Sequence, residues 1–420
     1  MQTRGAMGYL LGRYRAVLRK CRLLNVFGTL AMAAMLAGTG TAQAASSITE
    51  SATITADTTV TMDAAAESSS SRLAGIIAEG GEIAVSTEDG ATLTITNSES
   101  STSGQRFYGA AVTDGGSLAL DGSLVFDLAA SEDSMLAQQA AALHLEGGSL
   151  TAEGSDIDAS ASGYYAYGVE AGSNSDVSFT DGTTDIEIST TYYGAGISAQ
   201  DGSSVTLSGT ISVTANGDSA DDVSGIQTGG GGEISIDGDV TVKLTGSATY
   251  MTGVWGSSSG TEASSISFSG ALTQIIIDAD SSWEAYGVSN YNSHGTTMTF
   301  DADETVISVT NRTTDSGDWT LAYMGHQSTT TITGSASITV DGGAGDAFGV
   351  NLQCDYGNTY DTLLTFSGET TSVEVSSANS VRALYSSGGP ATLSFTNAEG
   401  TVSVKATSTG YYACGIVAQY

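Results

Sequence analysis

The sequence predicts an all-β protein built as a right-handed parallel β-helix, or solenoid, of about twelve turns with three strands in each. Three observations support this fold class. A block of about 30 residues repeats along nearly the whole chain, and apolar and hydroxyl residues alternate in short segments. Gly occurs 54 times and Pro once among 420 residues. A fixed period of this length indicates equivalent units that stack on one another.

Each copy of the repeat begins with a Gly followed by an aliphatic residue. The most regular spacings, of 28, 29 and 28 residues, run from Gly168 to Gly253. The Gly anchors are Gly75, Gly109, Gly168, Gly196, Gly225, Gly253, Gly287, Gly349 and Gly415, and weaker copies without Gly are expected near Ala142, Met324 and Ala383. Later spacings are looser, which indicates turns of constant circumference with insertions confined to loops.

The segment 205–208 shows how each predicted strand is built. Val205 and Leu207 alternate with Thr206 and Ser208, so the apolar pair should face the interior and the hydroxyl pair the solvent. Asp-Gly pairs, at 89–90, 114–115, 121–122, 181–182, 201–202, 237–238 and 341–342, predict the corners between strands. A β-sandwich and a β-rich low-complexity chain remain alternatives at this stage.

The first 44 residues differ from the rest of the chain. Six of the twelve Lys and Arg residues lie here, an apolar run spans 23–37, and Ala42-Gln43-Ala44 offers a cleavage site. This combination predicts an extended Sec-type signal peptide at 1–44, cleaved after Ala44. An uncleaved anchor is the alternative. Residues 45–71 form a Ser/Thr-rich N-terminal segment or cap, and residues 72–420 carry the solenoid repeats.

Charge limits the partners of the mature chain. The whole chain carries a formal charge of −34, and removal of the six leader cations leaves −40. Nucleic acid is therefore excluded as a partner, because phosphate binding needs clustered Lys and Arg. Anionic membrane surfaces and polyanionic glycans are disfavoured for the same reason. Cys354 and Cys414 sit at different repeat phases, so we expect them to be small apolar residues rather than a disulfide.

The chain resembles the passenger region of a Gram-negative autotransporter of the pertactin-like, adhesin-like β-helix type. The resemblance rests on the extended leader with its basic segment 13–20, on the Ser/Thr/Gly/Asn-rich array that is poor in Cys and Lys, and on the Gly-aliphatic turns. It implies an exported, non-catalytic protein of the outer-membrane surface or extracellular space, without a cofactor. It also implies adhesion or self-association, with a host surface, a glycan or a sister-cell passenger as partner.

The chain departs from this family at its C-terminal end. A complete autotransporter has a C-terminal membrane β-barrel, which would be expected in the full protein, and no segments here fit one. Residues 411–417 instead match 164–169 and open another turn. We therefore expect a C-terminally truncated chain; a complete secreted solenoid that pairs end to end is the alternative.

Catalytic and metal motifs are weak, and no catalytic, cofactor or metal residue is predicted. Residues 217–220 resemble a serine-protease segment but read better as a corner loop. Asp221-Asp222 and 293–295 resemble two polygalacturonase motifs, which leaves a β-helix carbohydrate-active enzyme as an alternative function. The segment 342–346 resembles a calcium nonapeptide but occurs once, and His144, His294 and His326 have no ligand spacing.

Paired tyrosines offer the best candidate for a binding surface. Pairs precede their anchors at similar phase, and they comprise Tyr164, Tyr165, Tyr192, Tyr193, Tyr411 and Tyr412. We expect a vertical ladder of these rings along one face, able to bind a sugar or a protein. A purely structural stack at one corner is the alternative. A stalk that supports a missing domain is a further alternative for the function of the whole chain.

Overall fold

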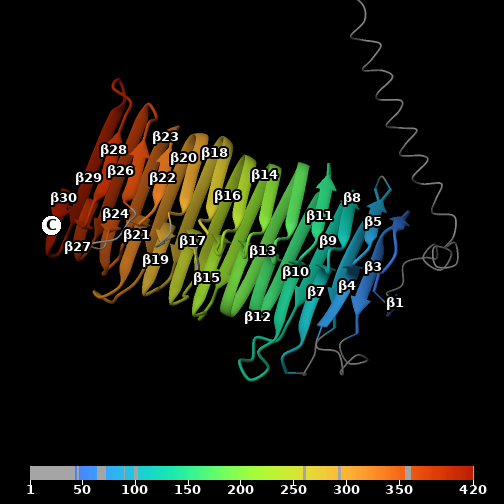
Figure 1. The fold of residues 1–420 in the computed structure, drawn as a ribbon. Coiled ribbons are helices and arrows are strands. Elements are labelled where there is room, and N and C mark those ends of the chain that lie inside the picture. Colours follow the sequence, from blue (N-terminus) through green and yellow to red (C-terminus); the bar gives the residue numbers. More distant parts are fainter. Residues whose placement is uncertain are drawn as a thin grey trace, which may run out of the picture. The chain divides into compact units, whose positions relative to one another are not determined.

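In the computed structural model the chain is described at residues 43–44, 47–63, 72–88, 90–98, 103–258, 262–291, 295–354 and 361–419. These residues form a β-solenoid of about 11 turns, with 73% strand and no helix. The predicted fold class is confirmed, with a turn count close to the expected twelve. Figure 1 shows the strands following chain order along the stack, from β1 to β30. Among the described residues no helix is long and apolar enough to span a membrane.

Three parallel sheets make up the solenoid, and each contributes one strand to a turn. The anchor sheet contains the Gly anchors. Its members are β4 (Arg72–Glu79), β7 (Arg106–Thr113), β10 (Gln139–Glu146), the C-terminal parts of β12 (Asp156–Gly172) and β13 (Asp176–Ala199), β15 (Asp222–Thr228), β17 (Tyr250–Gly256), β19 (Glu284–Tyr291), β21 (Trp319–His326), β24 (Asp346–Cys354), β27 (Ser380–Gly388) and β30 (Tyr412–Gln419).

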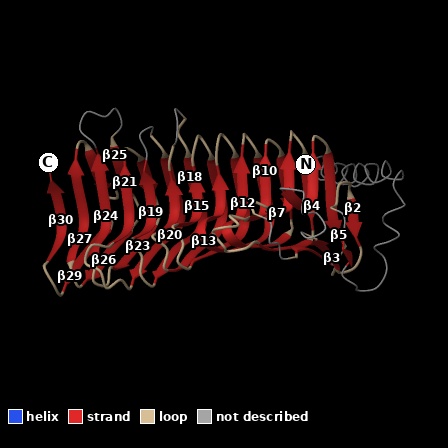
Figure 2. Ribbon diagram, turned by 90° about the horizontal axis from the view of Figure 1, so that it is seen from below, coloured by secondary structure: helices blue, strands red, loops and turns tan. Residues whose placement is uncertain are grey.

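The second sheet follows the anchor sheet within each turn. It comprises β2 (Ala52–Ile54), β5 (Glu82–Thr87), β8 (Ser117–Asp121), β11 (Ser149–Glu153), the N-terminal parts of β13, β14 (Ser204–Gly217), β16 (Glu233–Gly246), β18 (Ser265–Ala279) and β20 (Thr297–Asn311), then β22 (Thr329–Ile332), β25 (Thr362–Phe366) and β28 (Ala391–Phe395). Strands of neighbouring turns pair in register, and Figure 2 shows them side by side along the stack, seen from below.

The third sheet closes each turn. It comprises β1 (Gln43–Ala44), β3 (Thr58–Met62), β6 (Thr92–Asn97), β9 (Ser123–Ala129), the N-terminal part of β12, the middle of β13, the C-terminal parts of β14, β16, β18 and β20, then β23 (Ser335–Asp341), β26 (Thr370–Ser377) and β29 (Thr401–Ser408). The predicted signal peptide lies outside the described residues apart from Gln43 and Ala44. Strands β2 and β3 already stack on β5 and β6, within the segment expected as a cap.

The Gly anchors form one continuous column through the anchor sheet. Register places the column at Gly75, Gly109, Ala142, Gly168, Gly196, Gly225, Gly253, Gly287, Ala322, Gly349, Ala383 and Gly415. The expectation of a copy starting near Met324 is therefore off by two residues. Ala322 occupies the column, whereas Met324 lies on the outward side and packs against Leu321 and Phe348.

Sterics explain why Gly prevails in this column. A Cβ added at Gly168 would lie 2.2 Å from Cγ2 of Ile186, and one added at Gly225 would lie 2.3 Å from Cγ1 of Val242. These β-branched residues belong to the third sheet and fill the interior of the same turn. At these Gly positions the anchor strand thus approaches the core so closely that a side chain is excluded.

The interior is a single apolar core that runs along the stack. Val205 and Leu207 are fully buried, whereas Thr206 is exposed, as the alternation predicts. Equivalent residues of neighbouring turns stack on one another; the rings of Phe268 and Phe300, for example, lie 4.9 Å apart. One turn cannot bury its own apolar side, so stability comes from stacking between neighbours.

Two predicted corners have the backbone that an Asp-Gly turn requires. Asp114 and Gly115 have φ angles of 54° and 76°, and Asp201 and Gly202 have 51° and 75°. Positive φ at two successive residues is the geometry of a type I′ turn, which Asp-Gly favours. Asp89 lies outside the described residues, although Gly90 also has a positive φ. Cys354 and Cys414 belong to different columns, paired with Gly388 and Arg382 respectively.

Candidate functional site

The outward side of the anchor sheet gathers the aromatic residues that do not enter the core; we call it the aromatic face. Its aromatic members among the described residues are Tyr108, Tyr164, Tyr165, Tyr167, Tyr192, Tyr193, Tyr250, Trp255, Trp283, Tyr286, Trp319, Phe348, Tyr385, Tyr411 and Tyr412. All three tryptophans of the chain are included. The aromatic residues described in the other two sheets, such as Phe126 and Phe179, are buried in the core, except Phe395 of the last turn, which is 37% exposed.

Small apolar clusters confirm that these side chains lie outside the main core. One cluster joins Tyr108, Ala111 and Ala141 and receives Tyr167 at its rim. A second joins Leu321, Met324 and Phe348 and receives Tyr286 and Tyr385. Both are separate from the continuous interior core. The aromatic side chains of this face therefore pack against one another and against neighbouring apolar residues, and they are not isolated exposed rings.

The predicted tyrosine ladder exists over two neighbouring turns. The rings of Tyr164 and Tyr192 are stacked with centroids 4.7 Å apart and an interplanar angle of 1°. Tyr165 pairs in register with Tyr193, and its ring meets that of Tyr192 edge to face at 5.5 Å. Binding of a sugar or a protein by these rings stays a prediction.

The other predicted pair, Tyr411 and Tyr412, lies at the far end of the same face. Tyr412 occupies the column of Tyr193, but other residues separate the two. The intervening positions are Asp222, Tyr250, Glu284, Trp319, Asp346 and Ser380. The six tyrosines thus form two groups instead of one continuous ladder. The repeat phase correctly predicted that Tyr193 and Tyr412 share a column. It did not indicate that other residue types occupy most of the positions between them.

Single aromatic residues continue the tyrosine group toward the C-terminal end. Tyr250 and Trp283 lie on successive turns with ring centroids 5.5 Å apart. Trp283 is 51% exposed, and Trp319, one turn further, is 37% exposed. Sequence reasoning missed these residues because they do not occur as Tyr-Tyr pairs. Their position three or four residues before the anchor was the signal that would have found them.

Two carboxylates interrupt the aromatic rings in the middle of the face. The amide of Asp221 donates to the carbonyl of Tyr192 (2.9 Å), and the amide of Tyr250 donates to the carbonyl of Asp221 (2.9 Å). Asp222 pairs in register with Tyr193 on one side and Tyr250 on the other. An acidic pair therefore lies between two aromatic groups.

The surroundings of Asp222 disfavour the charged form of its carboxyl group. Burial, followed by the neighbouring charge of Asp221, raises the pKa of Asp222 to about 6. Burial and then the charge of Asp222 raise the pKa of Tyr193 to about 12, although its hydroxyl donates to Oε1 of Gln227 at 2.9 Å. Neither Asp221 nor Asp222 has a basic partner among the described residues.

The two ends of the aromatic face carry its cations. At the N-terminal end, Arg106 neighbours Tyr108, and Nδ1 of His144 lies 2.8 Å from Oε2 of Glu170. Tyr108 stacks on the ring of His144 with centroids 4.1 Å apart. At the C-terminal end, Arg382 lies 5.0 Å from the ring centroids of both Phe348 and Tyr412 and 5.2 Å from that of Tyr385.

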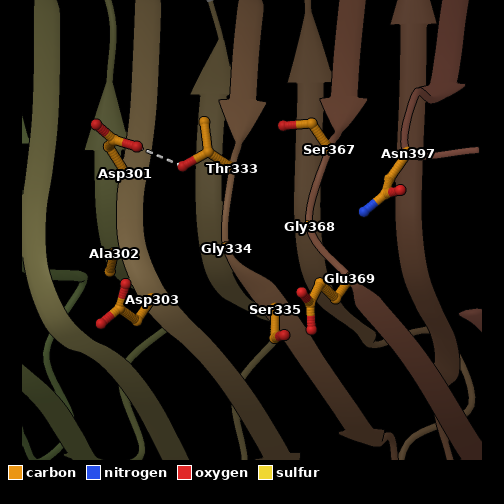
Figure 3. Close-up of a pocket in the computed structure, with 10 residues that line it drawn as sticks. All are labelled: Asp301, Ala302, Asp303, Thr333, Gly334, Ser335, Ser367, Gly368, Glu369 and Asn397. Carbon is orange, nitrogen blue, oxygen red and sulfur yellow. Dashed lines mark hydrogen bonds between the residues drawn. The ribbon is translucent and has the colours of Figure 1, made fainter. Parts of the chain in front are cut away.

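An acidic groove occurs elsewhere, at a corner between the second and third sheets (Figure 3). It has a volume of about 350 Å³, and Asp301, Asp303 and Glu369 line it together with Asn397 and the intervening Ser, Thr and Gly residues. Oγ1 of Thr333 donates to Asp301 at 2.5 Å. No three metal-ligating side chains come together within the described parts of the chain, this groove included.

The remaining motifs of the sequence fall at corners. Ser219 has a φ of 62°, and its amide donates to Oγ of Ser247 (3.2 Å), so 217–220 is a turn, as expected. In the segment 342–346, Asp346 accepts a hydrogen bond from Nδ2 of Asn379 at 2.8 Å. Ser293 and His294 lie outside the described residues, so the second polygalacturonase-like motif has no structural description.

No protein-family model, curated protein or solved structure matches the chain. The fold and the aromatic face are therefore the basis for any functional conclusion.

Proposed function

We propose that this chain is the β-solenoid passenger of an exported surface protein, similar to autotransporter adhesins, and that it binds through its aromatic face without catalysis. The observation that carries the proposal is the segregation of outward aromatic residues. Two sheets present Ser, Thr, Asp and Glu to solvent, whereas the third presents tyrosines and all three tryptophans. Exposed aromatic side chains gathered on one face in this way, here beside the carboxylates of Asp221 and Asp222, are typical of interaction sites.

The proposed location is the Gram-negative outer-membrane surface or the extracellular space. Its support is the leader-like sequence at 1–44 and the composition of the repeats. A β-solenoid suits export in an unfolded state, because turns can stack on one another as they emerge. A host surface, a glycan or a sister-cell copy remains the proposed partner, and nucleic acid is disfavoured by the −40 charge of the mature chain.

A triple substitution on the aromatic face tests the proposal. Tyr192→Ser, Tyr250→Ser and Trp283→Ser remove two exposed rings and one half-buried ring of the aromatic face without touching the core. A matched control, Thr151→Ser, Thr206→Ser and Glu233→Gln, changes outward residues of the second sheet. Beads coated with each protein are scored for bead clustering and for retention on cell monolayers and on a glycan panel. The proposal predicts that any activity of the intact protein is lost in the aromatic variant and kept in the control.

The opposite pattern would overturn the proposal. Equal activity in both variants would show that the aromatic face is not the contact surface. An intact protein that neither clusters nor adheres would leave a supporting stalk as the better account of the chain.

A β-helix carbohydrate-active enzyme is the second candidate, and one observation favours it. Asp222 has a pKa of about 6 beside Asp221 on an aromatic face, which suits a general acid. A glycan-hydrolysis screen of the intact protein and of Asp221→Asn, Asp222→Asn and His294→Ala variants tests it. Activity that disappears in these variants would replace the binding account by an enzymatic one.

A further inference from the structure

We propose that the middle of the aromatic face binds the Lys and Arg side chains of a basic protein segment. This site, the central strip, comprises Tyr164, Tyr165, Tyr192, Tyr193, Asp221, Asp222, Tyr250, Trp283 and Glu284. The inference deepens the proposed function and rests on it in one respect, that the aromatic face is the contact surface. Beyond the proposed function, it specifies that the partner is recognised through its basic side chains.

The arrangement of rings and carboxylates carries the inference. The Tyr164–Tyr192 stack lies on one side of Asp221 and the Tyr250–Trp283 pair on the other. From β12 to β19 the strip crosses four steps of the stack, about 19 Å at the usual strand spacing. Aromatic faces beside carboxylates attract ammonium and guanidinium groups, through the ring quadrupole and through charge.

Tyr164 and Tyr250 both lie close enough to Asp221 to be affected by its negative charge. Desolvation raises the pKa of the Tyr164 and Tyr250 hydroxyls, and the charge of Asp221 contributes to both shifts. Glu284 accepts a hydrogen bond from the hydroxyl of Tyr286 (2.5 Å), which keeps this third carboxylate on the strip. Rings on both sides of Asp221 thus lie within range of its charge, and Glu284 adds a third carboxylate beside Tyr250.

Charge complementarity selects a cation over a neutral sugar. No Lys or Arg occurs in β12, β13, β15, β17 or β19, so the carboxylates of the strip are not neutralised by their own strands. A neutral ligand would desolvate Asp221 and Asp222 further without compensating their repulsion. A cationic side chain relieves that repulsion, and the charge of the mature chain steers basic partners toward it.

The inference is tested with peptides of defined charge. The exported full chain is titrated at about 0.15 M salt with deca-arginine, deca-lysine, deca-glutamate and the neutral sugar cellohexaose. Binding is followed by calorimetry and by tryptophan fluorescence, to which the exposed Trp283 contributes. We expect the two basic peptides to bind and to change the emission, and the acidic peptide and the sugar to have no effect.

Variants separate a defined site from general attraction to an acidic protein. Asp221→Asn with Asp222→Asn should weaken binding about tenfold, and Trp283→Leu about fivefold. The charge control is Asp185→Asn with Glu187→Gln, which removes two exposed carboxylates of β13 on the third sheet and should change the affinity less than twofold. Equal weakening in this control would overturn the inference, because binding would then follow net charge alone.

The assay also distinguishes this inference from the proposed function. If the basic peptides fail to bind while the aromatic triple variant loses adhesion, the contact surface is right and the ligand chemistry is wrong. If cellohexaose binds instead, the strip is a saccharide site and the inference is overturned. If neither peptide binding nor adhesion depends on the aromatic face, both accounts fail.

Discussion

Gly225 faces Val242 across the interior of one turn, and a Cβ added at Gly225 would lie 2.3 Å from Cγ1 of Val242 and 2.6 Å from the carbonyl oxygen of Gly253. The same exclusion recurs along the anchor column, with Ile186 opposite Gly168 and Val213 opposite Gly196. The anchor column is therefore a line of dense packing between the anchor sheet and the third sheet, and its Gly residues make the repeat visible in the sequence.

Substitution at this column should be costly. Gly225→Ala should lower the free energy of unfolding by about 1–3 kcal/mol, because the added methyl overpacks a dense core. Urea denaturation measures the change. The matched control is Gly415→Ala, where no atom lies within 4 Å of the added Cβ, and its effect should be near zero.

The double substitution Gly225→Ala with Val242→Ala tests whether Val242 is the residue that excludes a side chain at Gly225. Ala142 already stands in the anchor column, and Ala159 occupies the third-sheet column of Val242 in the same turn as Ala142. Removing the Val242 branch should therefore recover part of the loss, so the double variant should be more stable than the sum of the single effects predicts. Strict additivity would show that the backbone contact with Gly253, and not Val242, excludes the side chain.

Asp222 should make stability depend on pH in an unusual direction. Its folded pKa, about 6, lies above the ordinary carboxyl value, so the folded state holds its proton more tightly than the unfolded state. The stabilising contribution is present below pH 4 and is lost as the pH rises through 6. Asp222→Asn should therefore stabilise the protein at pH 7 by roughly 2 kcal/mol and have little effect at pH 4.

The comparison of unfolding at pH 4 and pH 7 needs a second variant. Glu233→Gln removes an exposed carboxylate of β16 and should have a small effect at both values. An Asp222→Asn protein that is less stable than the wild type at pH 7 would mean that the carboxylate forms a stabilising interaction when ionised.

Glu170 should contribute more to stability than Glu146, although both carboxylates lie on neighbouring strands. Glu170 accepts hydrogen bonds from Nε2 of Gln139 and engages the buried His144, each at 2.8 Å. Glu146 meets Arg72 at 3.4 Å, with both side chains about half exposed. Glu170→Ala should cost about 1–3 kcal/mol and Glu146→Ala less than about 1 kcal/mol in thermal unfolding. Similar costs for the two would contradict the packing described for the N-terminal end of the face.

Export should remove the leader after Ala44. The full chain, produced in a Gram-negative host, should be recovered from the periplasm or medium with Ala45 at its N-terminus, as mass spectrometry can show. Ala42→Asp with Ala44→Asp should block this cleavage, because the peptidase requires small residues there. A recovered protein that retains residues 1–44 would favour the uncleaved anchor.

The repeat was enough to predict the fold, because Gly-aliphatic anchors and alternating strands report directly on stacking. Two of the three anchors without Gly, Ala142 and Ala383, were also predicted correctly. The third was predicted two residues too late, because Met324 is an outward residue and Ala322 holds the column. The methyl group of Ala322 fits in the column, but nothing in the sequence distinguishes this Ala from the nearby Met324 as the anchor.

The candidate site was predicted only in part, for a physical reason. Tyr164 and Tyr192 were recognised because paired tyrosines repeat at one phase, and they do stack. The sequence offers Asp221 and Asp222 only as a possible catalytic pair, because their position between Tyr192 and Tyr250 depends on the register of strands 28 to 29 residues apart. Tyr250 and Trp283 carry no motif, and only the stacking of turns brings them together.

Footprinting of the adhering protein tests the central claim most directly. Hydroxyl-radical oxidation of the full chain, free and bound to its partner surface, reports the protection of individual side chains. The account predicts protection of Tyr192, Tyr250 and Trp283 together, with Met135, 83% exposed in a loop, and Phe395 of the second sheet unchanged. Protection confined to Met135 or Phe395, with the three aromatic residues oxidised as in the free protein, would contradict the claim that the aromatic face is the binding surface.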